Sequence, residues 1–265
     1  MKNTKKIYKL EKIVNKLPLT KDLFIKKYGE KALKQTQYFI ERKDAIEFSK
    51  KIFIDLDTWK KEDFEINFTD KNKKLDDIPS IAFSPFVTCL SEKCLKICYG
   101  TNQKFLSFIK FFYQIENTFL YLKYPDIFIK KFNAFLNLYQ PRYFRFFENG
   151  DLINLKNMID FNNLAADHPE TKFLLMTKKI NIANEFLKST GGKYAKNLML
   201  RFSNSNVKSC QISLNNPFSI PETEIVEKDS RVGENSTRCP GSKYGCLRCL
   251  NCWMSRKNIE FEIHR

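Results

Sequence analysis

The spacing of the cysteines constrains this chain more than any other feature. Seven of the eight fall in two short stretches, Cys89-x4-Cys94-x3-Cys98 and Cys239-x6-Cys246-x2-Cys249-x2-Cys252. A chain of 265 residues that is 43% hydrophobic can bury a large core without disulfide staples. Closely and regularly spaced cysteines in such a chain indicate metal ligands.

Neither a secretory signal nor a membrane span is expected. The basic first residues are followed by further Lys and Glu before any apolar signal region could form. No stretch of about 18 apolar residues is present. We therefore expect a cytoplasmic protein with no membrane partner, in a compartment where thiols stay reduced.

The central sequence alternates between apolar runs and amphipathic segments. The runs predict strands separated by helices, which is the pattern of a parallel α/β sheet whose strands are buried on both faces. The expected strands cover residues 81–83, 143–147, 172–177 and 197–202, and the expected helices cover residues 105–121, 152–166 and 180–187.

Three parts are expected along the chain. Residues 1–77 form a basic helical extension, with helices from Thr20 and over residues 44–53. Residues 78–208 form the α/β core, which includes the first cysteine cluster. Residues 209–265 form a cysteine-rich metal-binding segment with a final strand near residues 259–263.

Polar residues follow the apolar runs, where strands of a parallel sheet end. The carboxyl ends of such strands meet at one edge and commonly carry functional side chains. Asp151 has a second interpretation as a helix N-cap. Lys178, Arg201 and Ser203 could hold a carboxylate or a ribose, or be ordinary surface residues. The strand-end candidates are Glu148, Asn149, Gly150, Asp151, Lys178, Arg201 and Ser203.

The first cysteine stretch supplies three thiolates from one loop. Three ligands can hold a [4Fe-4S] cluster and leave one iron open for a substrate or cofactor. A zinc site would need a fourth ligand, and the chain offers only His168 and His264 as histidine candidates.

A three-cysteine loop after the first strand of an α/β barrel resembles the radical S-adenosylmethionine (SAM) enzymes. The gaps differ from the usual C-x3-C-x2-C by one residue each, and Tyr99 follows the last cysteine instead of preceding it. The resemblance implies a partial (β/α) barrel with SAM on the open iron. It implies catalytic roles for Asp151, Glu148 and Lys178, and cofactor binding by Asn149, Gly150, Asp151, Arg201, Ser203 and Tyr99.

The second stretch has four cysteines within fourteen residues. Its two successive x2 gaps are similar to the run that binds ferredoxin clusters, whereas zinc sites more often use two separated pairs. A second iron–sulfur cluster is therefore favoured, with zinc as the alternative. Cys210 is left over as an extra ligand or a small buried residue.

The formal net charge of +16 has two interpretations. Clustered Lys and Arg are typical of proteins that bind nucleic acid. The basic residues here are mostly Lys spread along the chain, which codon bias in an AT-rich genome also produces. A nucleic-acid partner is therefore one expectation; the oligomeric state is not predicted.

Several segments together resemble the gene product 88 family of phage and mobile-element proteins. They are CLSEKCLKICYG (89–100), RFFENGDL (145–152), LLMTKK (174–179), NLMLRFSNS (197–205) and CPGSKYGCLRCLNCWMSRKNIEFEIH (239–264). The resemblance implies an iron–sulfur protein of phage or mobile-element origin. We expect a radical-SAM-like enzyme of unknown substrate; the alternative is a non-catalytic nucleic-acid-binding protein stabilised by zinc or iron–sulfur.

Overall fold

The computed structural model describes residues 6–8, 38–41, 61, 65–69, 74–89, 105–205, 215–241 and 244–262. The helices expected from Thr20 and over residues 44–53 lie outside these residues, as do Cys94, Cys98, Tyr99, Cys210 and His264. The chain divides into two compact units. One contains Met1–Asn67 and Phe83–Phe128, and the other contains Phe68–Ala82 and Ile129–Arg265.

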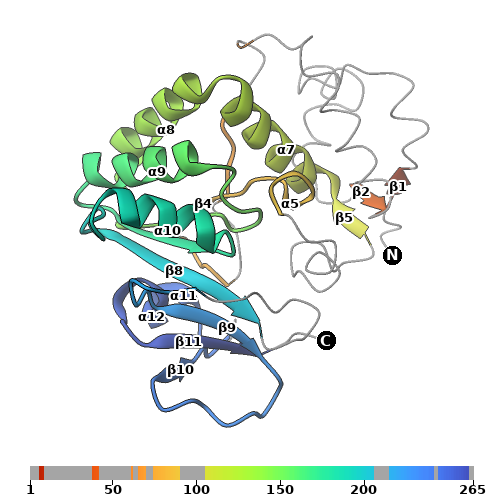
Figure 1. The fold of residues 1–265 in the computed structure, drawn as a ribbon. Helices are drawn as coiled ribbons and strands as arrows, with labels where there is room; N and C mark the ends of the chain where they lie inside the picture. The colour runs from red at the N-terminus through yellow and green to blue at the C-terminus, as the bar shows by residue number, and fades with distance from the viewer. Residues whose placement is uncertain are drawn as a thin grey trace. The chain divides into compact units, whose positions relative to one another are not determined.

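The first unit has a small sheet of three short strands (Figure 1). β1 (Lys6–Tyr8) is parallel to β2 (Tyr38–Glu41), and β2 is antiparallel to β5 (Phe105–Ser107). α5 (Pro85–Thr88) and α7 (Phe108–Lys123) follow the chain on either side of β5. The helix expected from residue 105 therefore begins three residues later, because the first three residues pair with β2.

Two buried polar side chains of α7, Glu116 and Asn117, bind the backbone of residues 65–67. Glu65 donates its backbone N–H to Glu116 Oε1 at 2.9 Å, and Asn67 donates its own to Asn117 Oδ1 at 2.7 Å. Glu116 and Asn117 are each about 1% exposed, so these bonds satisfy groups that would otherwise be costly to bury. The helix is buried on every side over residues 115–121, including the expected core residues Ile115 and Phe119, so it is not amphipathic there.

The second unit contains an eight-stranded sheet in the order β10-β11-β9-β8-β7-β6-β4-β3. Every neighbouring pair is parallel except β3 and β4. The strands are β3 (Phe68–Thr69), β4 (Ser80–Ile81), β6 (Tyr143–Phe146), β7 (Lys172–Thr177), β8 (Leu198–Ser205), β9 (Glu222–Val226), β10 (Ser236–Arg238) and β11 (Asn258–Glu262).

The α/β class expected from the sequence is confirmed, as are the strands expected over residues 143–147, 172–177 and 197–202, whereas β4 shares only Ile81 with the strand expected over residues 81–83. From β4 to β9 each strand lies beside the one before it in the sheet. Within the described residues the sheet has two open edges, β10 and β3, and no barrel closes.

Three longer helices cross between the strands: α8 (Pro125–Tyr139), α9 (Leu155–Asp167) and α10 (Ile180–Ser189). α9 starts at Leu155 because the Asn154 side chain caps it, accepting the Asn157 N–H at 2.9 Å. α10 ends where Gly192, with φ of 79°, donates to the Leu187 carbonyl at 2.7 Å. Of the described helices, none is long and apolar enough to cross a membrane.

Side chains of the central strands alternate between two faces of the sheet. Phe144, Phe146 and Phe173 point toward the helices, and the Phe146 ring stacks between Phe161 and Phe173 at centroid distances of 4.6 and 5.0 Å. Tyr143 and Leu174 point the other way and pack with Trp253. Figure 1 shows α9 and α10 along one side of the sheet and two short helices, α11 (Cys246–Cys249) and α12 (Asn251–Met254), along the other.

Candidate functional site

A buried carboxylate joins the carboxyl ends of β6 and β7. Asp151 is 4% exposed, and its Oδ1 accepts the Thr177 hydroxyl at 2.5 Å and the Leu152 N–H at 2.8 Å. Its Oδ2 accepts the Lys178 N–H at 2.8 Å. The N-cap interpretation of Asp151 is wrong, because Asn154 caps α9.

The environment of Asp151 favours the protonated acid more than water does. Burial raises the pKa of this carboxyl above its usual value, and the hydrogen bonds from Thr177, Lys178 and Leu152 only partly oppose the rise. Thr177 was expected only as the last residue of a strand. Its signal in the sequence is a hydroxyl at the end of an otherwise apolar run.

The neighbouring strand ends are joined in the same way. Lys178 Nζ lies 3.2 Å from Ser203 Oγ and 3.4 Å from the Ser203 carbonyl, which links β7 to β8. The Ser80 hydroxyl donates to Glu148 Oε2 at 3.0 Å, which links β4 to the end of β6. Asp151, Lys178, Ser203 and Glu148 therefore lie along successive strands of one sheet; we call them, with Thr177, the strand-end cluster.

The turn from Phe147 to Gly150, directly after β6, needs two unusual backbone conformations. Phe147 has φ of 54° and Gly150 has φ of 79°, so the chain reverses sharply after β6. Glycine adopts the second conformation without steric cost. Asn149 and Gly150 are both partly exposed beside the strand-end cluster.

Arg201 is the one described strand-end candidate that lies apart from this cluster. Its side chain is completely buried and points to the opposite face from the helices. Nε donates to the Cys252 carbonyl and Nη1 to the Lys257 carbonyl, each at 2.9 Å. Nη2 donates to the Asn251 and Ser255 carbonyls. Four of its five N–H groups thus hold the C-terminal segment.

That segment, residues 239–257, connects the parallel strands β10 and β11 and contains α11 (Cys246–Cys249) and α12 (Asn251–Met254). Trp253 is buried and donates Nε1–H to the Phe144 carbonyl at 3.2 Å. Cys246 donates its N–H to the Lys74 carbonyl at 2.8 Å. A side chain at Gly245 would collide with the Asp76 carboxylate, so glycine is required there.

All four C-terminal cysteines are free thiols. Burial raises the pKa of Cys252 to about 12, and it also raises the pKa of Cys246. Among the described residues, no three His, Cys, Asp or Glu side chains lie close enough together to hold a metal ion. A metal at these cysteines therefore stays a prediction, as does one at Cys89, whose two partners lie outside the described residues.

Four thiols are nevertheless the type of donor that a thiophilic metal takes. Arg145 and Arg201 oppose the rise in the pKa of Cys252 that burial causes. Arg145 Nε is buried without a hydrogen-bond acceptor in the described part of the chain. A cationic N–H of this kind suits a metal-bound thiolate.

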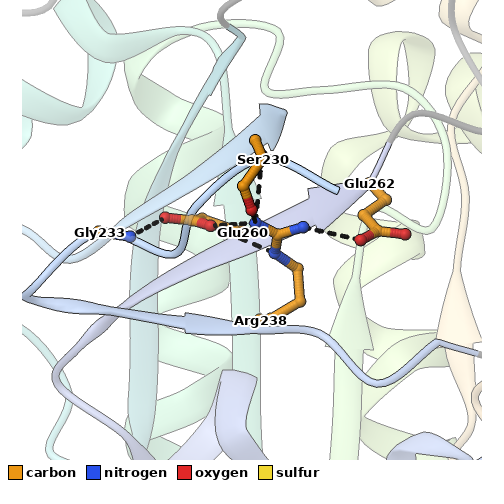
Figure 2. Close-up of polar contacts among 5 residues, drawn as sticks. All are labelled: Ser230, Gly233, Arg238, Glu260 and Glu262. Atoms are coloured by element: carbon orange, nitrogen blue, oxygen red, sulfur yellow. Dashed lines mark hydrogen bonds and ion pairs between the residues drawn. The ribbon is translucent and has the colours of Figure 1, made fainter. Parts of the chain in front are cut away.

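An ion-pair network fixes the strand that leads into Cys239 (Figure 2). Arg238 contacts Glu260 Oε2 at 3.0 Å and Glu262 Oε1 at 2.7 Å, and Gly233 N–H donates to Glu260 Oε1 at 2.9 Å. Cys239 N–H donates to the Glu260 carbonyl at 2.8 Å. β10 and β11 are therefore locked together directly beside the first cysteine of the segment.

Replacing Arg238 with Met should lower the free energy of unfolding by about 2 kcal/mol. The change leaves Glu260 buried without its cation, a loss reduced here because Arg238 is 19% exposed. Chemical denaturation measures the effect. Glu262→Gln is the matched control, because Glu262 is 40% exposed and should contribute less than about 1 kcal/mol. Equal losses in the two variants would contradict the prediction.

Comparison with known proteins gives one match. Residues 57–253 match the family model described as Gene product 88. The chain belongs to the gene product 88 family. No curated protein and no solved structure matches it. The gene product 88 match spans both cysteine stretches and the strand-end cluster, and so confirms the family resemblance seen in the sequence.

Proposed function

We propose that this gene product 88 protein is an iron–sulfur enzyme of the radical SAM-like kind, with its cofactor site along the carboxyl ends of β4, β6, β7 and β8. The observation that carries the proposal is the strand-end cluster, in which polar side chains link the four neighbouring parallel strands β4, β6, β7 and β8. Ligands of parallel sheets bind at this edge.

The first cysteine stretch supports the same proposal. Cys89, Cys94 and Cys98 follow β4 in the chain and supply three thiols for a cluster with an open iron. When bound, a reduced cluster and SAM would supply the radical that abstracts hydrogen from a substrate. The protein's own part is to bind, orient and shield these groups.

Roles within the strand-end cluster follow from its contacts. Lys178 extends its ammonium to Ser203 and can pair with the carboxylate of SAM. Ser203 offers a hydroxyl for a ribose. Asp151 receives the Lys178 N–H and so fixes where that side chain begins, which makes it a positioning residue. Glu148, held by Ser80, is the remaining carboxylate for an ammonium group or a substrate proton.

The test is SAM binding to anaerobically purified protein, measured by titration calorimetry. Lys178→Met should weaken binding about 10- to 100-fold, the usual worth of a hydrogen bond to a charged group. Lys172→Met is the matched control, because Lys172 is exposed at the opposite end of the same strand and should leave the Kd unchanged. The Cys89→Ala/Cys94→Ala/Cys98→Ala variant should lose SAM binding and the iron held by the first cysteine stretch.

Two results would contradict the proposal: iron-free protein, or SAM binding that Lys178→Met leaves unchanged. The net charge of +16 then favours the alternative function, a metal-stabilised protein that binds nucleic acid. Binding of that kind weakens steeply as salt concentration rises, which separates it from SAM recognition.

A further inference from the structure

Arg145 lies on the face of the sheet that the cysteine-rich segment covers. In the parallel register it sits beside Leu174, and Leu174 sits beside Met199, so the three side chains point the same way. Leu174 belongs to the apolar cluster around Trp253, and Cys246 and Cys252 pack against that cluster. The strand pairing thus places Arg145 on the same face of the sheet as the apolar cluster against which two of the four cysteines pack.

One N–H donor of the Arg145 guanidinium lacks an acceptor in the described part of the chain. Its Nε–H is buried and meets no acceptor among the described residues. Leaving a buried donor unpaired costs about 1–3 kcal/mol, and more when the group is charged, so native proteins rarely keep one without a reason. Cys246 and Cys252, which pack against the apolar cluster on the same face, carry the candidate acceptor sulfurs.

Arg145 is one of several cations near the thiols. The Lys74 carbonyl accepts the Cys246 N–H at 2.8 Å, and Arg201 Nε donates to the Cys252 carbonyl at 2.9 Å, so both cationic residues are neighbours of the thiol-bearing residues. Four thiolates around one metal centre carry excess negative charge, which cations close to the sulfurs offset. Neutral thiols would have no such need, so the distribution of charge matches a tetrathiolate centre.

We propose that Cys239, Cys246, Cys249 and Cys252 bind a structural metal centre on this face of the sheet, and that Arg145 donates its Nε–H to one of the ligand sulfurs. All four positions are taken by protein, so the centre is closed to substrate, unlike the three-cysteine site. The sulfurs must come closer together to bind the metal, because no three of these described side chains lie near enough to hold an ion in this structure. Zinc and an iron–sulfur cluster share this ligand chemistry.

The test uses the full chain carrying Cys89→Ser/Cys94→Ser/Cys98→Ser, so that any remaining metal belongs to the C-terminal centre. Zinc, iron and acid-labile sulfide are measured after purification without oxygen. We expect about one zinc, or about four irons with four sulfides, per chain. Adding Cys246→Ser/Cys252→Ser should remove this metal. Absence of metal from the first variant, or its retention in the second, would overturn the proposed centre.

The role of Arg145 is tested in the same background with Arg145→Gln, and with Arg142→Gln as the exposed arginine control. Arg145→Gln should speed metal release to a chelator at least about tenfold, in line with other outer-shell losses. It should also shift the thiolate charge-transfer absorption of the cobalt-substituted or iron–sulfur protein, which a purely structural role would not change. The assignment would be overturned if Arg145→Gln released metal at the wild-type rate with an unchanged absorption spectrum. It would also be overturned if Arg145→Gln and Arg142→Gln had equal effects.

This inference and the proposed enzyme fail separately. Wild-type protein that holds the C-terminal metal but binds no SAM would count against the enzyme alone. SAM binding by protein that holds metal only at the first stretch would count against the C-terminal centre alone.

Discussion

Replacing Arg201 with Met should lower the free energy of unfolding by about 4 kcal/mol or more, the largest effect expected of any substitution considered. The guanidinium is completely buried and donates to four backbone carbonyls between Asn251 and Lys257. Methionine fills much of the space but donates nothing. The Asn251 carbonyl keeps the Ser255 N–H at 3.0 Å. Each of the others that is left buried without a partner costs about 1–3 kcal/mol.

Chemical denaturation of Arg201→Met beside Arg256→Met measures this effect. Arg256 is exposed in the same segment, so its replacement should change stability by less than about 0.5 kcal/mol. Arg201→Lys should also be strongly destabilising, because an ammonium cannot reproduce the planar fork that reaches several carbonyls. If Arg201→Met lowers the free energy of unfolding by less than about 1 kcal/mol, the segment does not depend on the hydrogen bonds of Arg201.

The second large effect is expected from Asp151→Ala, at about 3 kcal/mol. Alanine leaves the Thr177 hydroxyl and the N–H groups of Leu152 and Lys178 without their acceptor inside the protein. Thr177→Val is the matched control, because it removes one of these three donors and keeps the shape of the side chain. It should cost distinctly less; equal losses would mean that the hydroxyl alone explains the effect.

The same variant should reveal the shifted pKa of Asp151. Because the folded-state pKa is raised above the usual 3.8, folding takes up a proton between 3.8 and the folded value. The wild type's advantage over Asp151→Ala should therefore be greatest in acid and shrink as the pH rises through the folded pKa. Unfolding free energies measured across the acid range test this, and an advantage that grows with pH would contradict it.

The buried strands could be predicted from the sequence because a continuous apolar run of four to six residues between turn residues is typical of a strand buried on both faces. β7 covers the predicted residues 172–177, and β6 and β8 lie within a few residues of prediction. β9 and β10 were missed, because Glu and Thr alternate with few apolar residues and their partner β11 is distant in sequence. α8 was missed although Pro125 begins it and Phe128 and Phe132 share one face.

The candidate site was predicted in part for the same reason. Strand ends gather at one edge, so Asp151, Lys178 and Ser203 could be placed together before their contacts were known. Arg201 could not be placed correctly, because its role depends on the face it occupies and on carbonyls about 50 residues away. Arg145 carries no signal in sequence, since its importance arises only from the segment packed over it.

The position of the cysteines within one connection also bears on how the protein folds. Among the described strands β10 pairs with β11 alone, and β11 lies between β9 and β10 although it follows both in the chain. Residues 239–257 must therefore be ordered before β10 can pair, at a cost in loop-closure entropy. A metal bound to cysteines along this loop would reduce the entropy cost of closing it. The last strands should therefore assemble faster when metal is present. When metal is scarce, they should stay unpaired for longer and be prone to aggregation.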